Sequence, residues 1–299
     1  MTAVGIDLGG TKIETQVFDD DWQMIARNRV ATPRDYDALV AAVASQIAWA
    51  DGNTGVPAPV GIGAAGLINP VTGLALTANL VASGKPLPSD VATAAGRAVT
   101  YVNDCRALAL SEAVFGAGRG HRTVVSLILG TGVGGGIAID GAILHGPTQT
   151  GGEFGHTPAP AHLVAKYGLP IVQCGCGRMG CSETYIAGPG LSRIAKALIG
   201  SALTPQDIAA KRHAESAQVW QAWCDLVADL MRTLILTIDP DIIVLGGGLS
   251  QIDGVIDDLT TAAHAAQIGD FSIPPIVLAQ GGDTSGARGA AYAAWNGVT

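Results

Sequence analysis

Three thiols and one imidazole form the most specific chemical signal in this sequence. Three cysteines have the spacing C-x-C-x4-C, and 17 residues separate the first of them from a preceding histidine. Thiolates and imidazole are the ligands that structural Zn²⁺ prefers. Buried apolar cysteines are the alternative, but an odd number of cysteines at this spacing favours a metal. The sequence therefore predicts a structural zinc site with the ligands His156, Cys174, Cys176 and Cys181.

A glycine-rich turn near the N-terminus has the composition of a phosphate-binding site. An apolar segment at residues 4–6 leads into Asp-Leu-Gly-Gly-Thr-Lys. Paired glycines let backbone N–H groups approach a phosphate, and a carboxylate at the strand end could hold Mg²⁺ through its water shell. A plain hairpin turn with an exposed lysine is the alternative. We expect the turn to bind nucleotide phosphates through Asp7, Gly9, Gly10, Thr11 and Lys12.

Two further glycine-rich segments follow apolar strands in the second half of the chain. Residues 130–136 are no Walker loop, because no Gly-Lys-Ser/Thr follows, and no dinucleotide fingerprint, because they lead into a strand. This turn would suit the phosphates of ATP, whereas residues 246–248 offer a flat surface for adenine or ribose. A structural bend is the alternative for the first segment, and tight packing of a strand against a helix is the alternative for the second. The candidate nucleotide residues are Gly130, Thr131, Gly132, Gly134, Gly246, Gly247 and Gly248.

Asn103 and Asp104 lie between an expected strand and an expected helix. Capping of the helix N-terminus would account for Asp104 as a structural residue. The alternative is a general base, a carboxylate within hydrogen-bond reach of a substrate hydroxyl that is in line with a γ-phosphate. Both interpretations are open on these residues alone.

Strands and helices that alternate along the chain must position these groups. Hydrophobic periodicity predicts strands at 4–6, 13–17, 24–30, 60–64, 99–102, 123–129, 137–139, 242–245 and 276–279, and helices at 39–47, 91–95, 106–115, 191–199, 217–236, 256–266 and 285–295. Each half opens with a strand, a glycine-rich turn and a return strand, which is a weak internal repeat. The glycines of residues 116–120 suggest a hinge. Two α/β domains that face a cleft are therefore expected.

Composition excludes several classes of protein. Of the 299 residues, 48% are hydrophobic and 14% charged, and such a chain is not disordered. The net charge of −8 predicts no nucleic-acid partner and no anionic membrane partner. The N-terminus has no signal-peptide pattern, and the longest uncharged run, residues 52–84, contains three prolines. We therefore expect a cytoplasmic protein.

Together these motifs resemble the ROK family (repressor, open reading frame, kinase) of sugar kinases. The resemblance covers essentially the whole chain, in the family's order: residues 7–12, Asn103-Asp104, Glu153-x-Gly-His156, C-x-C-G-x2-G-C-x-E and residues 246–248. It implies an α/β fold of the two-domain, actin/hexokinase-like ATPase type with an interdomain cleft. We expect one domain at residues 1–118, which the helix at 285–299 could complete. The other is expected at 119–284 and carries the zinc-binding loop.

The resemblance also implies roles for individual residues. Asp104 would be the catalytic base, and His156 would serve both the zinc and the sugar. The implied cofactors are ATP, Mg²⁺ and structural Zn²⁺, and homodimers are common in the family. The implied sugar-binding residues are Asn79, Asn103, Asp104, Glu153, His156 and Glu183.

Several segments look most like those of bacterial N-acetylglucosamine kinases: residues 32–35, 82–87, 129–136 and 153–156. The expected activity is therefore ATP-dependent phosphorylation of the 6-hydroxyl of N-acetyl-D-glucosamine. Fructokinase, glucokinase and N-acetylmannosamine kinase share these motifs and are alternatives. A sugar-responsive regulator is disfavoured, since the phosphate motif begins at residue 7 and the net charge is −8.

Two segments depart from the family pattern. Cys105-Arg106 replaces the common Ala-Asn, and the arginine could lower the pKa of Asp104 or reach a phosphate. Gly63-Ala-Ala-Gly66 replaces a common Gly-x-Pro-Gly and would give a more flexible turn.

Overall fold

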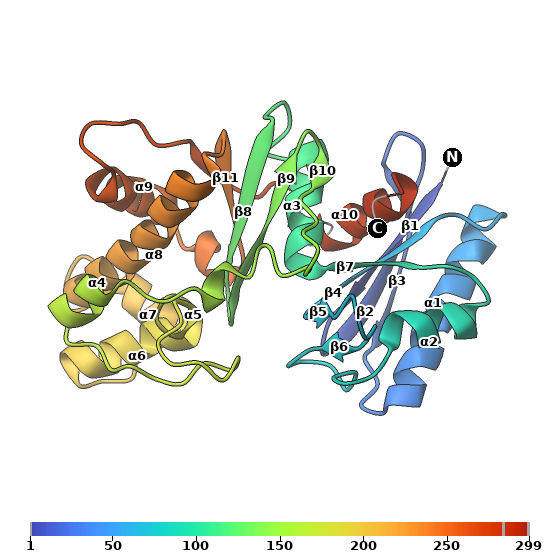
Figure 1. Ribbon diagram of the computed structural model, residues 1–299, viewed down its shortest axis with the longest axis horizontal. Coiled ribbons are helices and arrows are strands. Elements are labelled where there is room, and N and C mark those ends of the chain that lie inside the picture. Colours follow the sequence, from blue (N-terminus) through green and yellow to red (C-terminus); the bar gives the residue numbers. More distant parts are fainter. Residues whose placement is uncertain (1, 283–284, 298–299) are drawn as a thin grey trace. The chain divides into compact units, whose positions relative to one another are not determined.

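Two five-stranded sheets organise the protein, of which a computed structural model describes residues 2–282 and 285–297 (Figure 1). The first sheet has the order β3-β2-β1-β4-β7 and the second the order β10-β9-β8-β11-β12. The strands of the first sheet are β1 (Ala3–Leu8), β2 (Lys12–Phe18), β3 (Met24–Ala31), β4 (Val60–Ala64) and β7 (Thr100–Asn103). Those of the second are β8 (Thr123–Leu129), β9 (Val133–Ile139), β10 (Ala142–Ile143), β11 (Ile242–Gly246) and β12 (Ile276–Leu278). A short hairpin pairs β5 (Leu67–Ile68) with β6 (Ala75–Leu76).

The first sheet places candidate residues at one edge. β1 pairs antiparallel with β2 but parallel with β4, and β4 pairs parallel with β7. In this register Asp7 is opposite Gly63, and Ala64 is opposite Asn103. Because parallel strands share the direction of their carboxyl ends, Asp7 and Asn103 reach the same edge of the sheet.

Helices cover this sheet closely. They are α1 (Tyr36–Thr54), α2 (Leu87–Ala95), α3 (Asp104–Phe115) and α10 (Ser285–Trp295). A Cβ on Gly5 or Gly61 would collide with the α10 backbone at Ala287 or Ala290. Only glycine allows α10 to pack so close to β1 and β4. The C-terminal helix α10 therefore packs against the sheet that the N-terminal strands form.

The remaining helices surround the second sheet. They are α4 (Ala161–Lys166), α5 (Glu183–Ile186), α6 (Gly188–Ile199), α7 (Pro205–Ala210), α8 (Ala217–Ile238) and α9 (Val255–Ala266). The 3-10 turns are η1 (Phe154–His156) and η2 (Gly248–Gln251). The long helix α8 supplies much of the core, and its buried Trp223 donates from Nε1 to Ile186 O at 2.9 Å.

The chain divides into two compact units. The first comprises the described residues within 1–120, 136–151 and 280–299, and the second comprises residues 121–135 and 152–279. The sequence-based boundaries at residues 118 and 284 stay a prediction about independently folding domains. Within residues 2–282 and 285–297, no helix has the length and hydropathy needed to cross a membrane.

Candidate active site

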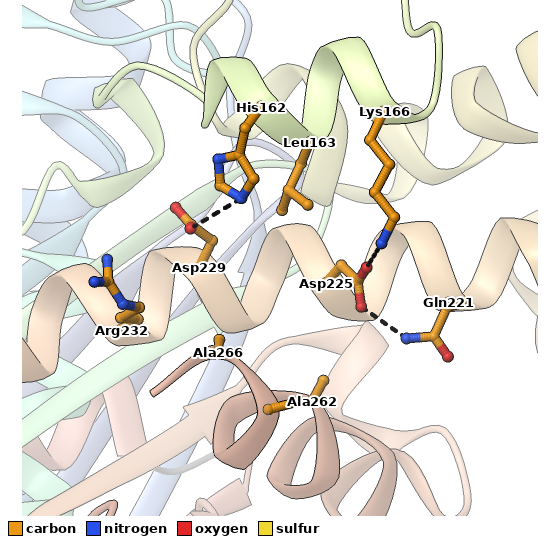
Figure 2. Close-up of a pocket in the computed structure, with 10 residues that line it drawn as sticks. His162, Leu163, Lys166, Gln221, Asp225, Asp229, Arg232, Ala262 and Ala266 are labelled. Carbon is orange, nitrogen blue, oxygen red and sulfur yellow. Dashed lines mark hydrogen bonds and ion pairs between the residues drawn. The ribbon is translucent and has the colours of Figure 1, made fainter. Parts of the chain in front are cut away.

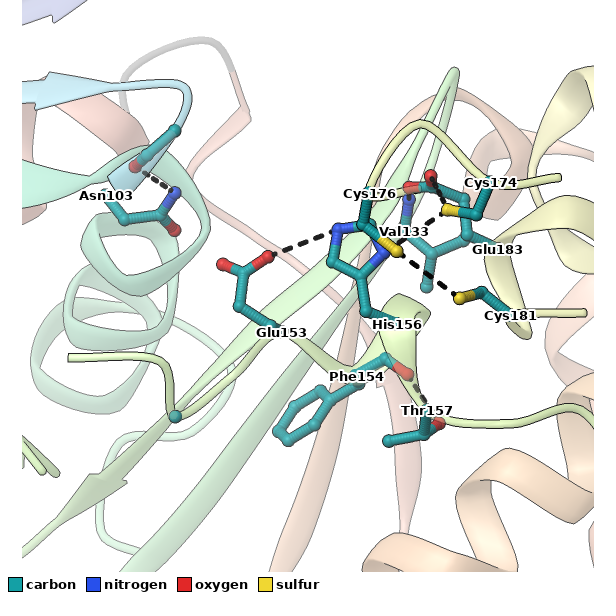
Figure 3. Close-up of polar contacts among 12 residues, drawn as sticks. Asn103, Val133, Glu153, Phe154, His156, Thr157, Cys174, Cys176, Cys181 and Glu183 are labelled. Atoms are coloured by element: carbon teal, nitrogen blue, oxygen red, sulfur yellow. Dashed lines mark hydrogen bonds and ion pairs between the residues drawn. The ribbon is translucent and has the colours of Figure 1, made fainter. Parts of the chain in front are cut away.

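Asn103 ends β7 and caps α3. Its Oδ1 accepts from Cys105 N at 3.0 Å and from Arg106 N at 3.3 Å, and its Nδ2 donates to Gly66 O at 3.0 Å (Figure 3). The residue is only 8% exposed. The capping function that the sequence allowed for Asp104 therefore belongs to Asn103, because the helix begins at Asp104, one residue earlier than a cap at Asp104 would require.

Asp104 is the first residue of α3, and its carboxylate is largely withdrawn from solvent. Oδ1 accepts from Cys105 N at 2.9 Å. Burial raises the pKa of Asp104, although hydrogen bonds from Cys105 and Asn103 oppose the shift. The pKa of Asp104 is therefore raised and not lowered as the sequence suggested, and the Arg106 guanidinium donates to the carbonyls of Gln149 and Gly151. A carboxylate whose pKa is raised is a stronger base once it is ionised.

The first glycine-rich turn connects β1 to β2 and is closed by its own backbone. Gly9 N donates to Lys12 O at 3.0 Å, and Thr32 Oγ1 donates to Gly9 O at 2.6 Å. A Cβ on Gly10 would lie 2.7 Å from Asn79 O. The predicted phosphate turn and the predicted sugar residue Asn79 are therefore in direct proximity.

Lys12 faces a buried carboxylate rather than solvent alone. Its Nζ lies 3.7 Å from Glu14 Oε2, which also pairs with Arg27 and Arg29. Burial would raise the pKa of Glu14, but hydrogen bonds from Arg27, Gln16 and Arg29 hold it at about 2. Part of the charge that the sequence assigned to a phosphate is therefore directed at Glu14.

The second glycine-rich turn opens into a pocket of about 450 Å³ within the second unit. Gly130 N donates to Gly132 O at 3.0 Å, and Gly188 N donates to Gly130 O at 2.8 Å. The sequence analysis missed the contribution of α6 and α7, because proline and glycine at a helix start carry no specific chemical signal. The lining residues are Gly130, Thr131, Gly188, Pro189, Ser192, Pro205, Gln206, Gly248 and Leu249.

The other predicted nucleotide glycines lie outside this lining. Gly246 ends β11 and Gly134 lies in β9. Gly247 has a φ of 85°, and a Cβ there would collide with the backbone of Leu129. Close packing of the chain thus accounts for Gly247, as the alternative interpretation of this segment proposed.

The four predicted zinc ligands are brought together, with all their ligand atoms within 4.8 Å of one another. Cys174 Sγ lies 3.5 Å from His156 Nδ1, and Cys176 Sγ lies 3.6 Å from Cys181 Sγ (Figure 3). A tetrahedral ion with Zn–S near 2.3 Å and Zn–N near 2.0 Å has ligand separations of about 3.5–3.8 Å. The donor set and its spacing therefore fit Zn²⁺.

Two of the three thiols in this cluster are unfavourable as anions without a cation, whereas a backbone hydrogen bond from Arg178 lowers the pKa of Cys176. Burial raises the pKa of Cys174, and it raises the pKa of Cys181 to about 12. A bound metal ion reverses this preference, because it holds its cysteine ligands as thiolates. Gly177 and Gly180, with φ values of 88° and 71°, make the turns that bring the cysteines together.

Two glutamates flank the thiol cluster. Glu153 Oε2 lies 3.7 Å from His156 Nε2, on the ring edge opposite the Nδ1 that faces Cys174. Glu183 Oε1 lies 3.6 Å from Cys174 Sγ, while its Oε2 accepts from Val133 N at 2.9 Å (Figure 3). Glu183 thus connects the cluster to the second glycine-rich turn, a link that the sequence did not predict because it joins a side chain to a backbone amide.

A larger groove of about 680 Å³ lies between α4, α8 and α9 and contains no predicted site residue (Figure 2). Its central carboxylate, Asp225, accepts from Lys166 Nζ at 2.9 Å and from Gln221 Nε2 at 2.7 Å. His162 Nε2 lies 4.0 Å from Asp229 Oδ1. These contacts are between neighbouring surface side chains, so we do not assign the chemistry to this groove.

Known proteins resemble this chain over nearly its full length. A model of the ROK family matches residues 3–296. The chain is 40% identical over 292 residues to the N-acetylgalactosamine kinase AgaK of Shewanella sp. (strain ANA-3), covering 96% of this chain and 94% of that protein. It is 39% identical over 296 residues to the N-acetyl-D-glucosamine kinase of Pectobacterium atrosepticum, covering 96% and 97%.

The fold is that of a solved relative. The crystal structure of a ROK hexokinase from Thermus thermophilus aligns with a TM-score of 0.88 at 30% identity, over 100% of this chain and 99% of that one. The predicted fold class, an α/β protein of the actin/hexokinase-like ATPase type, is thereby confirmed.

Proposed function

The chain belongs to the ROK family, and on this premise we propose that it is an ATP-dependent kinase that phosphorylates the 6-hydroxyl of N-acetyl-D-glucosamine. The half-buried carboxylate of Asp104, which directly follows the parallel strand β7 at the start of α3, is the observation that carries the proposal. Relatives named as kinases of N-acetyl-D-glucosamine and N-acetylgalactosamine support a 2-acetamido sugar as the substrate.

Asp104 acts as the general base in this proposal. Its carboxylate accepts the proton of the sugar 6-hydroxyl while the sugar oxygen forms a bond to the γ-phosphorus. The bond between the γ-phosphorus and its bridging oxygen breaks, and ADP leaves with that oxygen. The hydrogen bond from Cys105 N orients the carboxylate throughout.

The nucleotide is assigned to the two glycine-rich turns. The pocket beside Gly130, Gly188 and Gly248 suits the adenosine portion of ATP. Glycine backbone groups and the apolar rings of two prolines line this pocket. The first turn, from Gly9 to Lys12, is assigned to the phosphates. Asp7 at the end of β1 would hold Mg²⁺, which neutralises phosphate charge when it is bound.

The sugar is assigned to the polar side chains that the family resemblance implies. The Asn103 Nδ2 group carries two hydrogens, of which Gly66 O accepts one. Asn79, Glu153, His156 and Glu183 supply the further polar contacts. The backbone bond of Glu183 to Val133 couples the sugar ligands to the turn that holds nucleotide.

Zinc is assigned a structural role. His156 Nδ1 and the three thiols would hold the ion, while His156 Nε2 stays on the side of Glu153. Held by these residues, zinc would fix the imidazole ring and the loop that carries Glu183, without a part in proton or phosphoryl transfer. We also propose a cytoplasmic homodimer without a nucleic-acid partner, supported by the family resemblance and by the net charge of −8.

N-acetylgalactosamine is the second candidate substrate, because a relative that is 40% identical carries that name. A coupled assay of ADP formation separates the candidates, with kcat/KM measured for N-acetylglucosamine, N-acetylgalactosamine, N-acetylmannosamine, glucose and fructose. We expect a preference of about tenfold or more for N-acetylglucosamine, the range that differential transition-state binding supplies. A higher kcat/KM for another sugar overturns the substrate assignment, and no turnover with any of them overturns the kinase assignment.

A further inference from the structure

Arg106 is a buried cation in the first turn of α3, two residues after Asp104. Only 6% of the residue is exposed. Its Nε donates to Gly151 O at 3.0 Å, and its Nη2 donates to Gln149 O. Because the guanidinium is a rigid planar fork, it fixes two carbonyls of the same segment at once.

The segment that Arg106 binds has a backbone that needs such support. It follows β10 without regular secondary structure. Gln149 has a φ of 52°, in the left-handed region that residues with a side chain rarely adopt, and Gly152 has a φ of 97°. Strained backbone persists where surrounding contacts hold it in place. The two bonds from Arg106 are such contacts.

The same segment leads into the carboxylate that the proposed function assigns to the sugar. Glu153 follows Gly151 by two residues in the chain, and η1 (Phe154–His156) comes next. The position at which Gly151 is fixed therefore sets the point from which the chain enters the Glu-x-Gly-His motif. Arg106 itself is fixed by its place on α3, whose first residue is Asp104.

We propose that Arg106 is a positioning residue for sugar binding, which acts by anchoring the backbone at Gln149 and Gly151 ahead of Glu153. The proposal rests on the proposed function, because it requires Glu153 to be a sugar ligand. Arg106 itself touches neither the sugar nor the nucleotide. Removal of the Arg106 guanidinium is therefore expected to weaken sugar binding without an equal loss of nucleotide binding.

Steady-state kinetics of Arg106→Met and Arg106→Lys test the proposal. Methionine replaces the unbranched stem of the side chain but has no donors, and we expect the KM for the sugar to rise about 10- to 100-fold, while the KM for ATP changes less than about twofold. Lysine keeps the positive charge but can donate from one nitrogen only, so we expect an intermediate rise in the KM for the sugar. Equal changes in both KM values, or an unchanged KM for the sugar, would overturn the assignment.

Arg97→Met is the matched control. Arg97 also donates to a backbone carbonyl, that of Ala58, and to Asp51 Oδ1 at 2.8 Å, and neither of these partners is an assigned site residue. We expect it to lower the melting temperature as Arg106→Met does and to leave both KM values unchanged. A rise in the KM for the sugar in this control would show a general effect of destabilisation and overturn the positioning role.

Amide hydrogen exchange separates this proposal from the proposed function. In Arg106→Met, we expect faster exchange at residues 146–152 and unchanged exchange in α1 and α8. Unchanged exchange at 146–152 overturns the anchor even if the enzyme is a sugar kinase. If the wild-type protein phosphorylates no sugar of the panel, the proposed function fails, and the sugar-positioning role of Arg106 fails with it, whatever the exchange result.

Discussion

Two regions of the molecule concentrate polar side chains in opposite ways. The strand-end site (Asn103, Asp104) is built from consecutive residues, and backbone groups of the next helix satisfy most of its hydrogen bonds. The thiol cluster (His156, Cys174, Cys176, Cys181) gathers residues from separate segments whose polar atoms face mainly one another. The first region is satisfied by the hydrogen bonds of the protein, whereas the second has the donor set of a metal site. We infer that the first performs the chemistry and that the second positions the sugar ligands.

Replacement of Asp104 should have the largest effect. Asp104→Asn keeps the shape and the hydrogen bond from Cys105 N but cannot accept the sugar proton, so kcat should fall about 10²- to 10⁴-fold. Sugar affinity measured by calorimetry should stay within about threefold of wild type. Asp37→Asn, which alters an acidic residue in the first turn of α1, is the control. Near-normal turnover of Asp104→Asn would contradict the assignment of the chemistry to the strand-end site.

Loss of the metal should weaken sugar binding and leave the fold intact. We expect about one zinc per chain in the purified protein, and a sugar affinity about 10- to 100-fold lower in Cys181→Ser, since the loop that carries Glu183 loses its anchor. Cys224→Ser, at a buried cysteine of α8 outside the cluster, should keep its zinc. A wild-type zinc content below about 0.2 per chain would contradict the assignment.

A Cβ in the first turn should disturb both substrates moderately. In Gly10→Ala the new methyl group would lie 2.7 Å from Asn79 O, so the turn and the Asn79 segment must separate. We expect the KM values for ATP and for the sugar each to rise about tenfold. Gly52→Ala in α1, where a Cβ meets nothing within 4 Å, is the control and should not change either. A change in the KM for ATP alone would show that Asn79 is not a sugar ligand.

The smallest effect should be on stability. The pKa of Asp104 is raised in the folded protein, so the folded state holds its proton to a higher pH than the unfolded state does. Stability is therefore lost as pH rises from the ordinary carboxyl pKa through the raised one. Asp104→Asn should unfold at a temperature about 2–4 °C higher than wild type at pH 8, with a smaller difference at acid pH. An equal difference at both pH values would contradict this cause.

The sequence predicted the elements well where hydrophobic periodicity was strong. The expected strands and helices are present, including the long helix over residues 217–236, which the structure extends to α8 (Ala217–Ile238). Short elements such as β5, α5 and α7 were missed, because two to six residues show no period. The clustering of His156 with the three cysteines could be predicted from the sequence, because the spacing of the thiols is specific to metal sites.

Contacts made by the backbone were beyond sequence reasoning. Asn103 and not Asp104 caps α3, because the helix begins one residue before the position that a cap at Asp104 would give. The bonds of Glu183 to Val133 N and of Arg106 to Gln149 O and Gly151 O pair side chains with amide groups that every residue carries. Nothing in the type or spacing of residues identifies such partners.

The identity of the product tests the central claim most directly. Wild-type protein is incubated with N-acetylglucosamine, ATP and Mg²⁺, and the products are followed by ³¹P NMR. The account predicts ADP and N-acetylglucosamine 6-phosphate in equal amounts. Phosphate on another hydroxyl, or ADP released with inorganic phosphate and no sugar phosphate, would contradict it.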